Sequence, residues 1–316
     1  MTVAFTFPGQ GSQTVGMGKA LAENFAGARA VFEEIDSALG QKLSRLMWEG
    51  PEAELTLTEN AQSALMAVSM AVLRVLESEH GINVANTAAF VSGHSLGEYS
   101  ALAAAGTFTL TDAARLLKTR GLAMQAATPV GVGAMAALLG LDFKTAAEVA
   151  AQAAQGEVCQ AANDNSDGQV VVSGNLAAVE RALVIAKERG AKRAILLPVS
   201  APFHCALMQP AAEAMAEALA NVTIKAPVVP LIANVVALPL TDPAMIREKL
   251  VEQVTGTIRW RECVGYMAAQ GVDCFCELGA GRVLTGLLKK NAAQALGFAI
   301  GTPDDIAAAA AQLKQG

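Results

Sequence analysis

The 316-residue sequence has few charged and few aromatic residues, and both shortages exclude a class of protein. Charged residues make up 16% of the chain, aromatic residues 4%, and the formal net charge is -6. Binding to a nucleic-acid backbone depends on clustered lysine and arginine, and single strands also need aromatic side chains for base stacking. We therefore expect no nucleic-acid partner.

A long uninterrupted apolar run is also absent, although the mean hydropathy is +0.38. No stretch approaches the roughly 18 apolar residues from which a spanning helix is predicted. Residues 1–7 have neither the basic start nor the apolar length of a secretory signal. The sequence therefore predicts a protein without a membrane segment or a signal peptide.

Cysteine is scarce and its arrangement fits no zinc site. The five cysteines lie at positions 159, 205, 263, 274 and 276. An odd number without metal-type spacing favours reduced thiols in the cytoplasm. We expect neither a disulfide framework nor a bound metal.

Short apolar runs alternate with longer helical patterns, which predicts an α/β protein with a largely parallel sheet. Residues 3–7 and 87–92 are expected to be strands, and residues 60–79 carry apolar side chains at helical spacing between them. Further helices are expected at 95–105, 111–128 (with Thr111 and Asp112 as its cap) and 306–312, and further strands at 231–235, 274–278 and 297–301.

The pattern changes between residues 129 and 198. Strands are expected at 134–139, 158–162, 169–173 and 193–197, and helices at 142–155 and 176–189. This βαββαβ order is that of the ferredoxin-like motif. We predict a small ferredoxin-like domain at 129–198, inserted into a larger α/β domain formed by 1–128 and 199–316.

Residues 93–97 match the G-x-S-x-G pattern of a nucleophile elbow, between a predicted strand and a predicted helix. Glycines relieve the backbone crowding of such a sharp turn and leave Ser95 at its tip. The N-terminus of the following helix offers unpaired N–H groups for a developing oxyanion. The alternative is an ordinary strand-turn-helix link with a capping serine.

A serine nucleophile needs a base, and the chain has only three histidines. His94 adjoins Ser95 in the turn and is best explained as a packed turn residue. His80 ends a predicted helix beside Gly81. His204 lies in a loop and remains as the candidate base, with a satisfied surface histidine as the alternative.

No acidic residue is marked by a motif as the group that orients the imidazole. Asp242 and Asp273 are candidates by residue type only, and both are better explained as flanking residues of secondary-structure elements. A backbone carbonyl could accept the second ring N–H instead. The sequence leaves this choice open.

Several segments together resemble the malonyl-CoA:acyl carrier protein transacylase family over about the first 300 residues. They are F-P-G-Q-G-S-Q at 7–13, G-H-S-L-G-E-Y at 93–99, Arg120-Gly121, G-Q-V-V at 168–171, S-A-P-F-H-C at 200–205 and G-A-G at 279–281. The resemblance implies a hydrolase-like core with a parallel sheet and an inserted ferredoxin-like domain. It also implies malonyl transfer from malonyl-CoA to the phosphopantetheine thiol of acyl carrier protein, for fatty acid biosynthesis, without a metal or redox cofactor.

Phe203 departs from many stand-alone bacterial members, which carry a smaller residue there, but it fits the malonyl-type signature of polyketide acyltransferase domains.

The resemblance also implies a role for individual residues. Ser95 would be the acylated nucleophile and His204 its base, with Gln10 and the Leu96 N–H as the oxyanion hole. Arg120 would bind the malonyl carboxylate, since a guanidinium matches a carboxylate in a two-pronged pair. Asn234 and Gln253 fall where the family holds the histidine, which a main-chain carbonyl would orient.

An acidic carrier protein would need a basic patch on this acidic chain. Lys187, Arg189, Lys192 and Arg193 form one candidate cluster, and Arg282, Lys289 and Lys290 form another. Solvated helix ends explain both clusters equally well.

Two other functions stay open at this point: a serine esterase or thioesterase with the same elbow, and a non-catalytic carrier-binding module.

Overall fold

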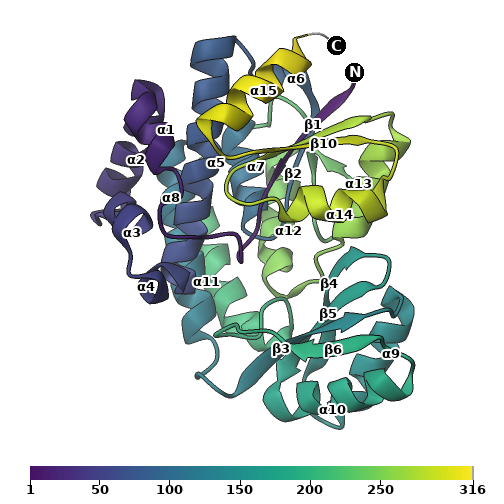
Figure 1. Ribbon diagram of the computed structural model, residues 1–316. Helices are drawn as coiled ribbons and strands as arrows, with labels where there is room; N and C mark the ends of the chain where they lie inside the picture. The colour runs from purple at the N-terminus through teal and green to yellow at the C-terminus, as the bar shows by residue number, and fades with distance from the viewer. Residues whose placement is uncertain (315–316) are drawn as a thin grey trace.

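The computed structural model describes residues 1–314 and contains two β-sheets, each with its own helices (Figure 1). The larger sheet has the strand order β10-β9-β1-β2-β7-β8, and all its neighbouring pairs are parallel except β7 and β8. Its strands are β1 (Val3–Phe7), β2 (Ala88–Gly93), β7 (Leu231–Ile232), β8 (Pro239–Leu240), β9 (Cys274–Leu278) and β10 (Leu296–Ile300). The predicted α/β class with a mostly parallel sheet is confirmed.

Strand β1 runs through the middle of this sheet and packs on both faces. Val3, Phe5 and Phe7 point into one hydrophobic core, whereas Ala4 belongs to the core on the opposite face. This alternation follows from the two-residue period of a strand. Helix α5 (Thr58–His80) lies in the first core, and helices α13 (Trp260–Ala269) and α14 (Val283–Asn291) cover the other face (Figure 1).

The remaining helices of this part are mostly short. They are α1 (Lys19–Asn24), α2 (Ala26–Leu39), α3 (Leu43–Glu49), α4 (Glu52–Thr56), α6 (Val84–Thr87), α7 (Gly97–Ala104), α8 (Leu110–Ala126), the 3-10 helix η1 (Ala206–Met208), α11 (Gln209–Ala220), α12 (Pro243–Thr255) and α15 (Pro303–Leu313). None of the helices within residues 1–314 combines the length and apolar character needed to cross a membrane.

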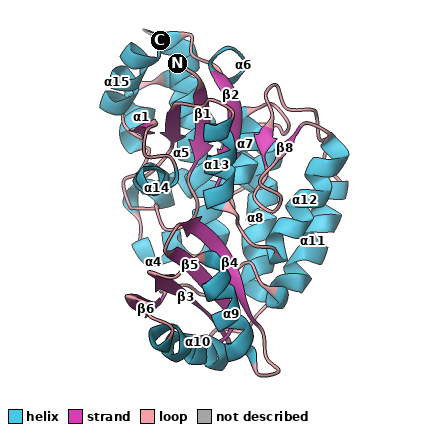
Figure 2. Cartoon of the chain, turned by 90° about the vertical axis from the view of Figure 1, so that its right-hand side faces the viewer, coloured by secondary structure: helices cyan, strands magenta, loops and turns pink. Residues whose placement is uncertain are grey.

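The smaller sheet is antiparallel, with the strand order β4-β5-β3-β6 (Figure 2). The chain passes through β3 (Gly133–Leu139), α9 (Phe143–Ala154), β4 (Cys159–Ser166), β5 (Gln169–Asn175), α10 (Leu176–Glu188) and β6 (Arg193–Leu196). This sheet and its two helices enclose a separate hydrophobic core of mostly alanine and valine.

Local structure corrects three of the predicted boundaries. Helix α8 is capped by Thr109 rather than by Thr111 or Asp112, because Thr109 Oγ1 accepts a hydrogen bond from the Asp112 N–H at 3.0 Å. The helix predicted from residue 95 begins at Gly97, since Ser95 has a φ of 55°. The strand predicted at 231–235 ends at Ile232.

Candidate active site

The turn between β2 and α7 has the backbone geometry of a nucleophile elbow and leaves no room for a Cβ at Gly93 or Gly97. A Cβ on Gly93 would lie 1.9 Å from the Gly97 carbonyl oxygen, and a Cβ on Gly97 would lie 2.2 Å from the Phe7 carbonyl oxygen. Ser95 itself has a φ of 55°, in the left-handed region that L-residues rarely adopt. The strained turn carries the Ser95 side chain into a cavity of about 540 Å³.

His204 is in hydrogen-bond contact with Ser95. Its Nε2 lies 2.8 Å from Ser95 Oγ, and its Nδ1 lies 2.9 Å from the Gln253 main-chain oxygen. A carbonyl oxygen can only accept, so Nδ1 carries the proton and Nε2 is free to take one from Ser95. The imidazole therefore contacts a carbonyl and neither candidate acid: Asp242 caps α12, and Asp273 accepts from the Thr2 N–H.

Burial keeps this imidazole neutral. His204 is 4% exposed, and desolvation, reinforced by the nearby Arg120 charge, lowers its pKa to about 3. A neutral imidazole at neutral pH can act as a general base. The imidazolium that it forms would be stabilised by the Gln253 carbonyl.

Asn234 and Gln253 both hydrogen-bond the turn around Ser95, and Gln253 also binds His204. Asn234 Oδ1 accepts from the Ser95 N–H at 2.9 Å, and its Nδ2 donates to the Gly93 carbonyl at 2.8 Å. Gln253 Nε2 donates to the Ser95 carbonyl at 3.0 Å. Of these two residues, Gln253 contacts His204 through its main chain, whereas Asn234 binds the turn around Ser95.

Arg120 is 1% exposed, and its guanidinium points at Ser95. Its Nη2 donates to Ser95 Oγ at 3.1 Å and to Gln253 Oε1 at 2.8 Å, and its Nη1 donates to Gln62 Oε1 at 2.8 Å. The guanidinium also lies 5.6 Å from the centre of the Tyr99 ring. Burial lowers the pKa of Arg120. No carboxylate within residues 1–314 forms an ion pair with it, so this cation lacks a direct partner of opposite charge.

Close packing of α8 against α5 brings Arg120 to this place. A Cβ on Gly121 would lie 2.6 Å from Glu59 Cα, so only glycine lets the two helices approach this closely. Arg115, on the same helix, instead donates to the Ala38 carbonyl at an exposed position. The two arginines thus occupy different environments.

Gln10 and Leu96 line the same cavity as Ser95 and follow the parallel strands β1 and β2. Gln10 Nε2 donates to Thr58 Oγ1 at 3.3 Å. The Leu96 N–H forms no hydrogen bond with another residue of the described chain, so it is free to donate to a bound group. The loop after β1 is tight against the elbow, since a Cβ on Gly9 would lie 2.9 Å from the His94 carbonyl oxygen.

The sequence pattern of the family described as "Acyl transferase domain" matches residues 4–309. The chain belongs to this acyl transferase domain family. It is 47% identical over 314 residues to the malonyl CoA-acyl carrier protein transacylase of Bacillus subtilis (strain 168), covering 99% of this chain and 98% of the relative. The Escherichia coli (strain K12) transacylase is 46% identical over 97% of this chain and 98% of its own length.

Solved structures agree with this assignment. An acyl-carrier-protein-S-malonyltransferase from Bartonella henselae superposes with a TM-score of 0.97 at 58% identity, covering 99% of this chain and 100% of the other. A malonyl-transacylase solved in complex with its type II PKS acyl-carrier protein superposes with a TM-score of 0.95 at 40% identity, over 99% of this chain and 100% of that one.

In this acyl transferase domain, the smaller sheet supplies one wall of the cavity. Met135, Asn163, Asn165 and Val171 line it from β3, β4 and β5. Asn165 Oδ1 lies 2.8 Å from His94 Nε2, so the residue beside the nucleophile is hydrogen-bonded across the cavity wall. The elbow histidine is therefore a bonded wall residue rather than a simple packed turn residue.

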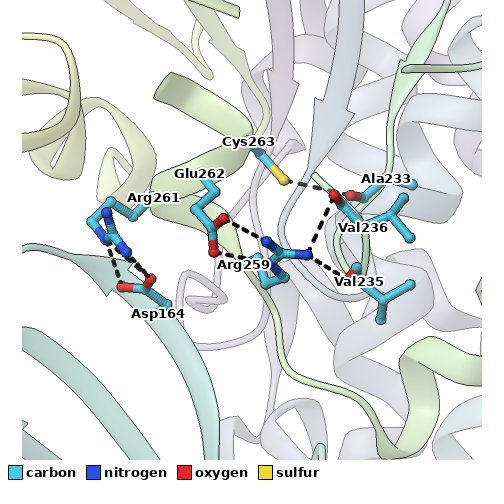
Figure 3. Close-up of polar contacts among 8 residues, drawn as sticks. All are labelled: Asp164, Ala233, Val235, Val236, Arg259, Arg261, Glu262 and Cys263. Carbon is cyan, nitrogen blue, oxygen red and sulfur yellow. Dashed lines mark hydrogen bonds and ion pairs between the residues drawn. The ribbon is translucent and has the colours of Figure 1, made fainter. Parts of the chain in front are cut away.

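The start of α13 connects this wall to the loop that holds Asn234 (Figure 3). Arg261 pairs with Asp164 of β4, a buried carboxylate, at 2.8 Å. Arg259 donates to the Val235 and Val236 carbonyls at 3.4 Å, and the Cys263 thiol donates to the Ala233 carbonyl at 3.6 Å. One helix terminus thereby fixes parts of the cavity that are distant in sequence.

Two buried residues of the site were not predicted from the sequence. Gln62 on α5 accepts from Arg120, and Glu98 on α7 accepts from Gln253 Nε2 at 2.8 Å. Glu98 lies in the G-H-S-L-G-E-Y segment, three residues after Ser95, where a buried charge could have been noticed. Gln62 could not be identified in this way, because a single glutamine on an otherwise apolar helix matches no sequence motif.

Proposed function

We propose that this chain transfers the malonyl group from malonyl-CoA to the phosphopantetheine thiol of acyl carrier protein, through a malonyl ester on Ser95. The product, malonyl-acyl carrier protein, would supply fatty acid biosynthesis. The observation that carries the proposal is Arg120, a buried guanidinium 3.1 Å from the nucleophile and without a carboxylate partner in the described chain. A buried cation requires a compensating charge, and the free carboxylate of a malonyl thioester supplies one.

In the first half-reaction, His204 Nε2 removes the Ser95 hydroxyl proton as Oγ attacks the thioester carbonyl. The tetrahedral oxyanion accepts hydrogen bonds from the Leu96 N–H and from Gln10. The carbon–sulfur bond then breaks, and the proton on His204 passes to the departing CoA sulfur. The malonyl ester stays on Ser95, with its carboxylate on Arg120.

In the second half-reaction, the carrier thiol gives its proton to His204 and its sulfur attacks the ester. The carbon–oxygen bond breaks, and His204 returns the proton to Ser95 Oγ. This scheme is ping-pong, and CoA is its leaving group. We propose that no metal or redox cofactor takes part, since every proton transfer has an assigned donor and acceptor.

For the carrier protein, we propose a docking site near Lys187, Arg189, Lys192 and Arg193. These side chains are exposed at the end of α10 and the start of β6, and Arg189 already pairs with Glu148 at 3.8 Å. Charge reversal at Lys187 and Lys192 should raise the KM for the carrier protein and leave loading from malonyl-CoA unchanged. An unchanged KM for the carrier protein would instead favour docking at the cluster of Arg282, Lys289 and Lys290.

For the architecture, we infer that residues 129–198 form a ferredoxin-like domain inserted into a hydrolase-like core of residues 1–128 and 199–316, of which positions 315 and 316 lie outside the described residues. The element order β3-α9-β4-β5-α10-β6, the antiparallel sheet and the separate hydrophobic core support this division.

The test of the proposed function is intact-protein mass spectrometry after mixing with malonyl-CoA or acetyl-CoA. We expect a malonyl adduct on Ser95 that disappears when carrier protein is added. An esterase would release malonate at a rate independent of carrier protein. A binding module would form no adduct at all.

A further inference from the structure

Glu98 is a buried carboxyl group that the proposed reaction does not use. It lies in the first turn of α7, is 1% exposed and does not line the cavity. Its Oε1 has no hydrogen-bond partner among residues 1–314. A carboxyl group held in this way costs stability, which calls for a functional reason.

The other carboxylate oxygen binds two residues of the catalytic centre. Glu98 Oε2 accepts from Gln253 Nε2 at 2.8 Å and from the Asn234 N–H at 3.1 Å. Glu98 Oε2 faces the NH₂ side of the Gln253 amide, from which the Ser95 carbonyl and Asn234 Oδ1 also accept. The amide oxygen must then point the other way, where it accepts from Arg120 Nη2 at 2.8 Å.

Above about pH 7, the value to which burial raises the pKa of Glu98, this chain of contacts places a negative charge one amide away from Arg120. A carboxylate in direct contact with the guanidinium would compete with an incoming substrate carboxylate for the same N–H groups. With Gln253 between them, Glu98 balances part of the buried positive charge and leaves Arg120 available.

We propose that Glu98 is a positioning residue that, through the Gln253 amide, holds Arg120 in the orientation that receives the malonyl carboxylate. The inference rests on the proposed function and adds a specificity determinant to it. It assigns no contact between Glu98 and the substrate.

The test compares Glu98→Gln with Glu277→Gln. Glutamine keeps the shape of Glu98 but removes its charge and adds a donor that can face either edge of Gln253. Glu277 is an equally buried carboxylate, but it accepts from the Leu284 and Thr285 N–H groups at the start of α14, outside the cavity lining. It therefore controls for loss of any buried carboxylate.

Steady-state constants for malonyl-CoA and acetyl-CoA, measured at about pH 8, where Glu98 is ionised, give the readout. Glu98→Gln should raise the KM for malonyl-CoA about tenfold with a smaller change in kcat, and lower the malonyl-to-acetyl ratio of kcat/KM about tenfold, as expected for one weakened charged contact. Glu277→Gln should keep the wild-type ratio. A wild-type ratio in Glu98→Gln, or an equal loss for both substrates, would overturn the inference.

Gln253→Leu keeps the test decisive if Glu98→Gln does not fold. This variant retains the main-chain carbonyl that binds His204 but also removes the amide's hydrogen bond to the Ser95 carbonyl, so kcat falls for both substrates and only the ratio is diagnostic. We expect a comparable fall in the malonyl-to-acetyl ratio, and in the double variant no further fall, because the two residues act in one path. An unchanged ratio in Gln253→Leu contradicts the inference. If the wild-type enzyme itself shows no preference for malonyl-CoA, the proposed function fails instead.

Discussion

The two sheets contribute to the cavity in different ways. The parallel strands β1, β2 and β7 all end at the same edge, and the loops that follow them carry Gln10, Ser95 and Asn234. The antiparallel sheet has a core of its own and adds wall residues such as Met135 and Val171. Ligands of open α/β sheets bind at the carboxyl ends of the strands, and the reacting groups here follow that rule.

This difference suggests a division of labour. The larger sheet would supply the chemistry, and the smaller sheet would supply the shape of the site. Changes in the first should then abolish turnover, whereas changes in the second should mainly affect stability and KM.

The largest effect is expected at the nucleophile. Ser95→Ala should lower turnover on the order of a million-fold, because the covalent intermediate cannot form. Mass spectrometry should detect no malonyl adduct, and circular dichroism should show an intact fold. Near-normal transfer by this variant would remove the elbow from the mechanism.

Replacing the base should have the next largest effect. His204→Ala should reduce acylation by at least about a thousandfold, since general-base assistance and the orientation of Ser95 are both lost. His80→Ala, at the end of α5, is the matched control and should acylate normally. If folded His204→Ala and His80→Ala proteins were equally impaired in acylation, His204 would not be the base.

Burial of Glu98, in the part of the molecule that contains the larger sheet, should make the free energy of unfolding depend on pH. Burial raises the pKa of Glu98 to about 7, from an ordinary value of 4.5. The folded state therefore retains this proton at pH values where the unfolded chain has released it. Relative to Glu98→Gln, the wild-type free energy of unfolding should fall by about 3 kcal/mol as pH rises from 4.5 to above 7. Urea unfolding of both proteins across this range measures it, and a difference independent of pH would contradict the assignment.

The smallest effect is expected where the smaller sheet joins α13. Arg261→Met removes the charged partner of buried Asp164 and should cost about 1–3 kcal/mol of stability, with KM for malonyl-CoA raised a few-fold and kcat nearly unchanged. Arg45→Met, which breaks an exposed pair with Glu49, should change neither. A collapse of kcat in Arg261→Met would break the division of labour between the sheets.

The sequence predicted those parts of the site that depend on local backbone geometry. The glycines around Ser95 mark the elbow because the turn cannot hold a Cβ at Gly93 or Gly97. Elimination among the three histidines pointed to His204, which does lie 2.8 Å from Ser95, and its role as the base stays a prediction. Strands β1 and β9 were located by short apolar runs.

Other features depend on contacts between distant segments and left no local signal. Gln62 and Arg120 are 58 positions apart, and Glu98 and Gln253 are 155 apart. Helices α3 and α4 are only 7 and 5 residues long, too short for a clear apolar period. Strand β7 has two residues, because the chain turns at once to present Asn234.

The most direct test of the account is the ratio of kcat/KM for malonyl-CoA to that for acetyl-CoA, in wild type and Arg120→Ala. Removing one partner of a desolvated charge pair typically costs about 2–5 kcal/mol, or roughly thirty- to several-thousand-fold. We predict that Arg120→Ala loses malonyl transfer by such a factor and keeps or gains acetyl transfer, with Arg120→Lys intermediate because an ammonium lacks the planar fork. An unchanged ratio in a folded Arg120→Ala protein would mean that the substrate carboxylate is recognised elsewhere.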